Sequence, residues 1–314
     1  MLSRSPIRSL ARLISVLTLS ALAACSRGAP EPASRTEDTQ PASAEIRIAS
    51  RTVLADEVLW ALGPEVRGRV AAVSPIADDA RYSLVADRWP QAAPRLGQNP
   101  EELLALGPGL VILASFSNVE YRAAIEGKVE LLVLDDFSGF AGYRENLSRI
   151  GAAVGAPEAA AALREDFDRE LAAIEARRPP LAAGEERPDI VAWSYGNVAG
   201  AHTSFDDAAT AAGFRNRAAL EGIDGHRNLG HEQLVAWNPR WLVIGCGELS
   251  CDEARAALAA EPGLGHLAAI EEGRVIAVPP PYLGTVGAGL LELARKLQAP
   301  LLAETNTKAE ASPP

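Results

Sequence analysis

The sequence predicts an α/β protein made of two Rossmann-like lobes that are joined by one long α-helix. The first observation is the segment 157–178, whose apolar residues recur at steps of three and four and so form one helical stripe. The second is a pair of similar blocks at 99–113 and 230–244, each typical of a short amphipathic helix, a proline-marked turn and a buried strand. Third, apolar strands alternate with helices on both sides of the long helix, a pattern typical of parallel sheets covered by helices.

The segment 157–178 carries helix signals at both ends. Pro157 suits the first helical position, where its missing N–H costs nothing, and the prolines from Pro179 onward stop the helix. Glu158 complements the positive end of the helix dipole. At ~1.5 Å per residue the helix would be about 33 Å long, the size of a small domain. We therefore expect a rigid strut between the lobes.

The two blocks that flank this helix match each other position by position. Glu101 matches Glu232, and a leucine, an alanine and a proline also coincide. Chance similarity between two helix-turn-strand units is the alternative. We interpret the matches as related positions in an N-terminal lobe at 45–156 and a C-terminal lobe at 179–302, bridged by the helix at 157–178.

Residues 1–25 have the composition of an export signal. Arginines precede an apolar run at 13–22 that is too short to span a bilayer as a mature helix, and small residues lead to Cys25. This resembles the lipobox of bacterial lipoproteins, in which the cysteine is diacylated and becomes the first residue; an ordinary secretory signal is the alternative. We expect an exported, lipid-anchored protein with its body in the periplasm or on the cell surface, a disordered linker at 26–44 and a disordered tail at 303–314.

Length and charge limit the classes of partner. The 314 residues are enough for one large or two smaller domains, and the formal net charge is -11. Such acidity argues against nucleic acid or an anionic membrane surface as a direct partner, and it favours a partner with a basic face. The protein is expected to be a monomer.

Two cysteines remain once Cys25 is assigned to the lipid. Cys246 and Cys251 lie in the sequence C-G-E-L-S-C. An even number of cysteines in an oxidising compartment favours a disulfide, which here would close a loop after a strand. Two free thiols are the alternative, and a zinc site is less favoured because it would need further ligands.

Parallel sheets of this kind bind ligands outside the carboxyl ends of their strands. Aromatic and charged side chains follow several predicted strand ends, and we expect a cleft there between the lobes. Arg51 and Arg81 are candidates to pair with an anionic ligand. The aromatic candidates for apolar walls, for which core packing is the alternative, are Tyr82, Trp89, Phe116, Trp193, Tyr195 and Tyr282.

Several segments together carry a resemblance to a known family. In order, they are R-I-A-S with the helix V-L-A-D-E-V-L-W-A-L-G, then P-R-L-G-Q-N-P-E-E-L-L-A-L-G-P-G-L-V-I, T-S-F-D-D-A-A-T-A-A-G-F-R-N and E-Q-L-V-A-W-N-P. Over residues 45–298 the chain resembles the periplasmic binding proteins of the ferric-siderophore and vitamin B12 ABC importers. The resemblance implies the class III, helical-backbone fold, with the ligand held between lobes that close only modestly. It also implies a membrane permease and its ATPase as partners, with Glu101 and Glu232 docking on permease arginines; helix capping is the alternative for both glutamates.

The positions of the histidines in the sequence distinguish between the classes of ligand. All four lie in the second predicted lobe, so a bare zinc or manganese ion held by histidines from both lobes is excluded, and we expect no resident cofactor or metal. His202 should lie at the cleft, and haem fits if His202, Tyr82 or Tyr195 supplies an axial ligand. We rank a ferric siderophore slightly above cobalamin, and haem third.

An exported enzyme is the main alternative from another class. The chain has no G-x-S-x-G, H-E-x-x-H or glycine-rich phosphate loop. Asp135 and Asp136 form a carboxylate pair, but neighbours on an extended strand point to opposite faces and make poor acid–base partners. We therefore predict a binding protein without catalytic residues. A tethered sensor that binds ligand without a transporter is a further alternative.

Overall fold

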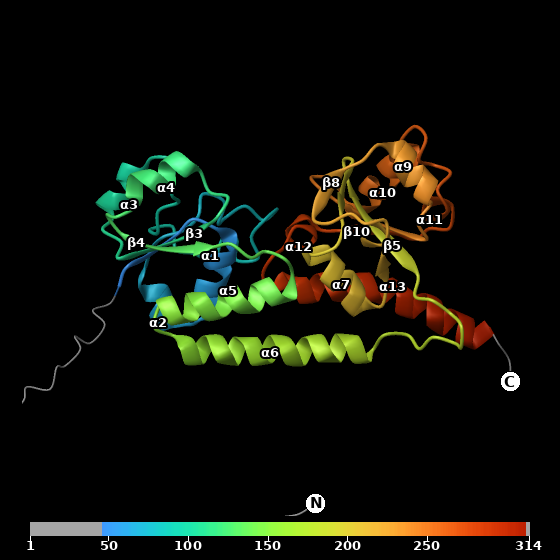
Figure 1. Ribbon diagram of the computed structural model, residues 1–314, viewed down its shortest axis with the longest axis horizontal. Helices are drawn as coiled ribbons and strands as arrows, with labels where there is room; N and C mark the ends of the chain where they lie inside the picture. Colours follow the sequence, from blue (N-terminus) through green and yellow to red (C-terminus); the bar gives the residue numbers. More distant parts are fainter. Residues whose placement is uncertain (1–45, 312–314) are drawn as a thin grey trace, which may run out of the picture. The chain divides into compact units, whose positions relative to one another are not determined.

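The computed structural model describes residues 46–311, which belong to one compact unit (Figure 1). The predicted signal peptide, Cys25 and the predicted linker lie outside the described residues. Within the described part, no helix combines the length and the apolar character that crossing a membrane would require.

The first half of the described chain forms the N-lobe, which is built on a parallel sheet. Its strands lie in the order β2-β1-β3-β4. β3 is buried along its whole length, as expected of a continuous apolar run inside a parallel sheet. The strands are β1 (Ile48–Ser50), β2 (Val70–Ala72), β3 (Leu110–Ala114) and β4 (Glu130–Leu134), and the helices are α1 (Val53–Ala61), α2 (Pro64–Gly68), α3 (Pro100–Ala105), α4 (Val119–Ile125) and α5 (Phe140–Ala153).

The second half forms the C-lobe, whose sheet is mixed. β10, β9 and β5 are parallel, β6 and β8 add an antiparallel edge, and β7 pairs with the start of β5. The strands are β5 (Asp189–Ser194), β6 (Asn197–Ala199), β7 (Arg215–Asn216), β8 (His226–Asn228), β9 (Trp241–Gly245) and β10 (Val275–Val278). The helices are α7 (Ser204–Ala212), α8 (Arg217–Leu220), α9 (His231–Trp237), α10 (Cys251–Ala260), α11 (Ala268–Glu271), α12 (Pro280–Leu283) and α13 (Gly289–Ala311).

Helix α6 (Pro157–Ala176) is the long helix that the sequence predicted, and it runs along one side of both lobes (Figure 1). The predicted apolar stripe is its packed face, with Phe167 and Ile174 buried against α5, α7 and α13. The main hydrophobic core runs without a break from the N-lobe sheet through these helices to the C-lobe sheet. The predicted fold class, two α/β lobes joined by one long helix, is therefore confirmed.

The lobes also meet directly at the beginning of α5. The carboxylate of Asp207, on α7, accepts a hydrogen bond from the backbone N–H of Phe140 at 2.7 Å and so stabilises the amino end of α5. Gly139 makes this approach possible, because a Cβ at that position would lie 2.4 Å from Oδ2 of Asp207. Its φ of 103° is also a conformation that glycine alone adopts readily.

The prediction of a disordered tail at 303–314 is wrong for most of that range. Helix α13 continues to Ala311, and only residues 312–314 lie outside the described part. Glu304 accounts for the difference, because its carboxylate bonds to Arg240 at 2.9 Å and reaches Arg274 at 3.4 Å on the C-lobe. Once a helix is held in this way, extending it by further residues costs little, even where the sequence has no apolar stripe.

Candidate ligand-binding cleft

A cleft of about 1300 Å³ lies between the two lobes, at the carboxyl ends of the strands of both sheets. The N-lobe wall consists largely of residues that follow β1, β3 and β4, and much of the C-lobe wall of residues that follow β5, β9 and β10. Six of the predicted ligand-binding residues line this cleft: Arg51, Arg81, Tyr82, Phe116, Tyr195 and His202.

Large apolar side chains stand exposed on the cleft walls. Phe116 is 77% exposed and leans on Phe137, with ring centroids 5.1 Å apart. Ile76 on the N-lobe and Leu249 on the C-lobe, neither of which the sequence singled out, also line the cleft with exposed side chains. Apolar side chains exposed on both walls of one cleft are typical of a site for a large, partly apolar ligand.

Tyr195 stands at the tip of the hairpin between β5 and β6. Ser194 pairs with Asn197, so Tyr195 and Gly196 form a two-residue turn in which φ is 49° and 83°. Such turns favour Asn, Asp or Gly at the first position, and a bulky residue in this conformation is strained. The side chain of Tyr195 is 100% exposed, so no packing compensates for the strain. Uncompensated strain of this kind is found at functional positions.

His202 faces the cleft from the turn before α7, and its φ of 56° is also left-handed. Its Nδ1 lies 2.8 Å from Oδ1 of Asp224. The hydrogen bond to this carboxylate, together with its negative charge, raises the pKa of His202. A carboxylate behind an imidazole fixes the tautomer and the ring orientation of histidines that ligate metals through their other nitrogen.

The two predicted arginines differ in their freedom. Arg51 is fastened to the N-lobe, because its guanidinium stacks on Tyr121 at 3.7 Å and donates to the carbonyl of Gly97 at 2.6 Å. Arg81 is 52% exposed; it pairs with Asp79 on the same lobe at 2.7 Å and with Glu248 on the C-lobe at 3.4 Å. Arg81 is therefore the more accessible of the two guanidinium groups.

Two acids of α1, the half-buried Glu57 and the buried Asp56, were not among the predicted site residues. Glu57 lines the cleft and accepts a hydrogen bond from the N–H of Leu84 at 3.0 Å, and burial raises the pKa of Glu57 to about 7. Asp56 is fully buried, and its carboxylate accepts a hydrogen bond from the hydroxyl of Ser74 at 2.5 Å; burial raises the pKa of Asp56 to about 6. Two consecutive acids inside an otherwise apolar helix directly after β1 were the available signal.

The adjacent carboxylates Asp135 and Asp136 both line the cleft but are engaged separately. Asp135 pairs with Arg149 at 2.6 Å, while Asp136 accepts a hydrogen bond from Ser138 that lowers the pKa of Asp136. Their partners therefore differ. Within residues 46–311, no group of three or more His, Cys, Asp or Glu side chains is arranged to hold a metal ion.

Three predicted aromatic residues are not at the cleft. Trp89 is 3% exposed and packs edge-on against Trp60 in the N-lobe core, with centroids 5.2 Å apart. Trp193 is 5% exposed, because successive strand residues face opposite sides and its neighbour Ser194 lines the cleft instead. Tyr282 packs against the main core, where its ring lies 5.0 Å from the ammonium of Lys296.

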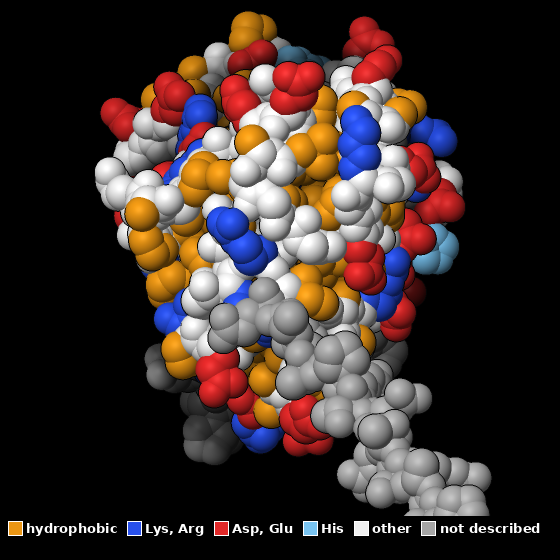
Figure 2. Space-filling view, turned by 90° about the vertical axis from the view of Figure 1, so that its left-hand side faces the viewer, with side chains coloured by type: hydrophobic (Ala, Val, Ile, Leu, Met, Phe, Trp, Pro, Cys, Tyr) orange, Lys and Arg blue, Asp and Glu red, His pale blue; other side chains and the backbone are white. Residues whose placement is uncertain are grey.

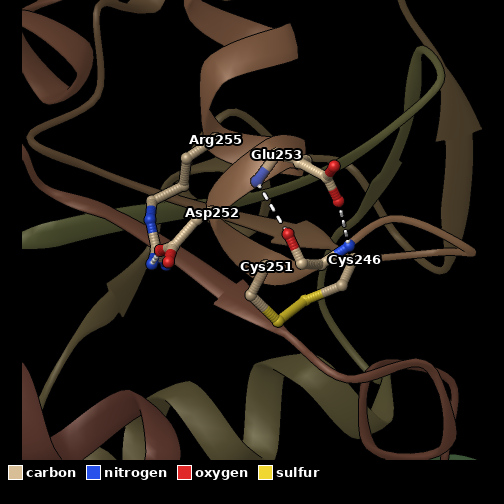
Figure 3. Close-up of a disulfide and its surroundings, with 6 residues drawn as sticks. Cys246, Cys251, Asp252, Glu253 and Arg255 are labelled. Atoms are coloured by element: carbon tan, nitrogen blue, oxygen red, sulfur yellow. Dashed lines mark hydrogen bonds and ion pairs between the residues drawn. A yellow bond between two sulfur atoms is a disulfide. The ribbon is translucent and has the colours of Figure 1, made fainter.

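Cys246 and Cys251 form a disulfide, the pairing that the sequence favours (Figure 3). It joins the residue after β9 to the first residue of α10, with the two Cα atoms 4.7 Å apart. At the beginning of α10, Ser250 and Glu253 cap each other's backbone N–H groups. Glu253 is labelled beside the disulfide in Figure 3, with its hydrogen bonds drawn as dashed lines. The closed loop borders the cleft, which Cys246 itself lines.

Glu101 and Glu232 are both exposed, each in the first turn of a short helix. Those helices, α3 and α9, lie on the side of the lobes away from α6 (Figure 1). Figure 2 views the N-lobe end of the molecule, and acidic side chains gather along its upper edge, over α3 and α4. The side chain of Asn99 already caps α3 by accepting from the N–H of Glu101, so α3 does not depend on the Glu101 carboxylate as its cap.

Comparison with known proteins identifies the architecture. A family model described as periplasmic binding protein matches residues 52–282. The chain belongs to this family. A periplasmic binding protein of this class is an exported substrate-binding protein of ABC importers and delivers its ligand to the permease. No curated protein sequence matches the chain.

Several solved periplasmic binding proteins share this fold. The periplasmic heme-binding protein BhuT, solved with two hemes, is 27% identical over 83% of this chain and 99% of its own, with a TM-score of 0.65. A periplasmic heme-binding protein from Pseudomonas aeruginosa is 26% identical over 82% and 92%, with a TM-score of 0.65. RhuT from Roseiflexus sp. RS-1, also a periplasmic heme-binding protein, is 25% identical over 81% and 98%, with a TM-score of 0.66.

Proposed function

We propose that this periplasmic binding protein captures haem in its interlobe cleft and passes it to an ABC permease while a lipid on Cys25 holds it to a membrane. One observation carries the proposal: two tyrosines and a histidine, drawn from both lobes, project into a single cleft with exposed apolar walls. The similar solved proteins BhuT, RhuT and the one from Pseudomonas aeruginosa are described as heme-binding, which supports the same choice.

The three side chains are of the types that bind haem iron. Phenolate and imidazole are both known axial ligands of haem. Tyr82 offers a phenol from the N-lobe, while Tyr195 and His202 offer a phenol and an imidazole from the C-lobe. The Asp224 carboxylate holds His202 through Nδ1, which leaves Nε2 for the iron.

The cleft walls suit a flat macrocycle better than a strongly anionic chelate. Phe116, Ile76 and Leu249 provide apolar surface for the porphyrin faces. The lining also holds four carboxylates, whereas its two guanidinium groups are already engaged with protein partners. A ligand with many negative charges would meet repulsion there, but haem carries its charge on two carboxylates at one edge. We therefore favour haem over a ferric siderophore and over cobalamin, although the prediction from the sequence ranked both of them above haem.

A titration of the Cys25→Ser variant, purified from the periplasm, tests the proposal. This variant keeps the whole body of the protein and removes only the proposed lipid attachment. Ferric protoporphyrin IX should shift its Soret band and saturate at a fixed stoichiometry, and His202→Ala or Tyr195→Phe should change the spectrum of the bound form. If ferric protoporphyrin IX leaves the absorption spectrum unchanged, while a ferric siderophore or cobalamin quenches the tryptophan fluorescence, then that compound and not haem is the ligand.

The same proposal assigns the contact with the permease and the anchor. Glu101 and Glu232 are exposed on matching helices of the two lobes, where carboxylates can pair with arginines of a permease. Lipidation of Cys25 would keep the protein near that permease, and it is tested by the mass of the mature amino-terminal peptide. A mature protein that begins elsewhere and carries no acyl chain would leave export without an anchor.

A further inference from the structure

We infer that the loop 247–250 is a strap: its Glu248 reaches Arg81 across the cleft and competes for it with the carboxylates of the ligand. The inference deepens the proposed function, since it names the residue that makes affinity depend on the charge of the ligand. It rests on the proposed function only for the identity of the ligand. The contact between the two lobes stands on the structure alone.

The strap is held firmly at both ends. Cys246, at the end of β9, is 5% exposed and packs in a small core with Ala254, and the disulfide ties it to Cys251 at the start of α10. At the other end Ser250 caps α10. Between these ends, Gly247, Glu248 and Leu249 line the cleft wall next to Cys246. A short loop fixed at both ends presents its side chains from a constant position.

The guanidinium of Arg81 is bonded closely to Asp79 on one side and is held only by a longer contact on the other. Asp79 takes its Nε and Nη2, at 3.0 and 2.7 Å, and this pair orients the fork. Nη1 then points across the cleft to Oε1 of Glu248, at 3.4 Å. A planar guanidinium with one edge already bonded offers its remaining N–H groups to one further anion. Glu248 and a ligand carboxylate therefore compete for the same donors.

The competition favours an incoming ligand. Glu248 is 85% exposed on its side chain, and a single exposed ion pair at this distance is weak. Arg81 also lies beside Tyr82, with its guanidinium carbon 5.6 Å from the ring centroid, so a carboxylate bound at Arg81 brings the rest of the ligand to the aromatic wall. The strap thus lowers affinity for ligands that need Arg81 and leaves uncharged analogues unaffected.

Titration with two porphyrins tests the strap. In Glu248→Gln, made in the Cys25→Ser background, the Kd for ferric protoporphyrin IX should fall by about two- to fivefold, the range expected for loss of an exposed ion pair. The Kd for its dimethyl ester, which has no free carboxylate, should not change. Asp252→Asn is the matched control, because it removes the same charge a few residues away and outside the cleft lining. Equal tightening for both porphyrins, or in Asp252→Asn as well, would overturn the inference.

The contact itself can be measured without a porphyrin. The side-chain Nε–Hε signal of Arg81, assigned by its loss in Arg81→Lys, should move in the nuclear magnetic resonance spectrum of Glu248→Gln and stay in place in Asp252→Asn. If the parent protein binds neither porphyrin, the haem proposal fails, and this signal alone then decides the strap. A signal that is identical in Glu248→Gln and in the parent protein would show that Glu248 does not engage Arg81.

Discussion

Tyr195 offers a sharp test, because one substitution in its turn should raise folding stability and weaken ligand binding. Replacing it by asparagine keeps the hairpin and supplies a residue that favours the first position of such a turn. A bulky L-residue in the left-handed region costs roughly 1–2 kcal/mol, and asparagine avoids part of this cost. The side chain is fully exposed, so the substitution removes no packing. Tyr195→Asn should therefore raise the free energy of unfolding by about 1 kcal/mol.

The assay combines unfolding with ligand titration. In urea unfolding followed by circular dichroism, the midpoint should rise with an unchanged slope, and the melting temperature should rise by about 2–4 °C for a protein of this size. The same variant should bind ferric protoporphyrin IX more weakly, because a candidate axial ligand is gone. A gain in stability together with a loss of binding is the signature of a residue kept for function.

Two further variants separate the causes. Tyr82 also lines the cleft but is not among the residues with positive φ, so Tyr82→Asn should affect binding without any gain in stability. Tyr195→Phe keeps the ring in the same backbone conformation and should leave stability unchanged while altering the spectrum of the bound iron. If Tyr195→Asn gains no stability, the turn is not strained; if it binds haem as before, Tyr195 is not part of the site.

Three other predictions concern the contact between the lobes at Gly139, the proposed permease contact of Glu101 and Glu232, and the dependence of stability on pH. Gly139→Ala should destabilise the protein by at least about 1 kcal/mol more than Gly155→Ala in urea unfolding, because both glycines have positive φ but only the first would press a Cβ against the aspartate of the other lobe. Glu101→Arg combined with Glu232→Arg should abolish uptake into cells and leave the Kd for ligand unchanged. The folded pKa of Glu57 is about 7, above its ordinary 4.5, so the folded state binds more protons and stability should fall as pH rises between these values. Glu57→Gln should make that slope smaller, and the slope that remains below about pH 6 comes from Asp56, whose pKa is raised in the same direction.

The docking prediction has a matched control. Glu65 and Glu158 are exposed glutamates in the first turn of a helix, as Glu101 and Glu232 are, so reversing their charges has a similar cost to the helix dipole. They belong to α2 and α6, on the side of the molecule away from α3 and α9 (Figure 1). Uptake that survives in the test pair, or that fails equally in Glu65→Arg with Glu158→Arg, would argue against specific docking.

Much of the fold was predictable, because local signals and packing agree. The stripe at 157–178 has helix signals at both ends, and α6 forms there with that stripe buried. The rule that ligands bind at strand carboxyl ends brought Tyr195 and His202 to one cleft from positions in different loops. Alternation along β5 already distinguishes Trp193 from Ser194, so the error at Trp193 could have been avoided from the sequence.

Other features depend on contacts between residues far apart in the chain. Arg51 appears free in the sequence, and only the fold brings Tyr121 and Gly97 to its guanidinium. The last turns of α13 depend on ion pairs of Glu304 with two arginines of the C-lobe. Local periodicity carries no information about such partners. The contact between Arg81 and Glu248, across 167 positions, is of the same kind.

The absorption spectrum of the protein purified from its native cells tests the central claim most directly, since it reads whatever ligand the cleft has retained. The account predicts a Soret band that is lost when the phenols of Tyr82 and Tyr195 and the imidazole of His202 are all removed. A spectrum of a corrinoid or of an iron siderophore, or a Soret band that survives removal of all three groups, would contradict it.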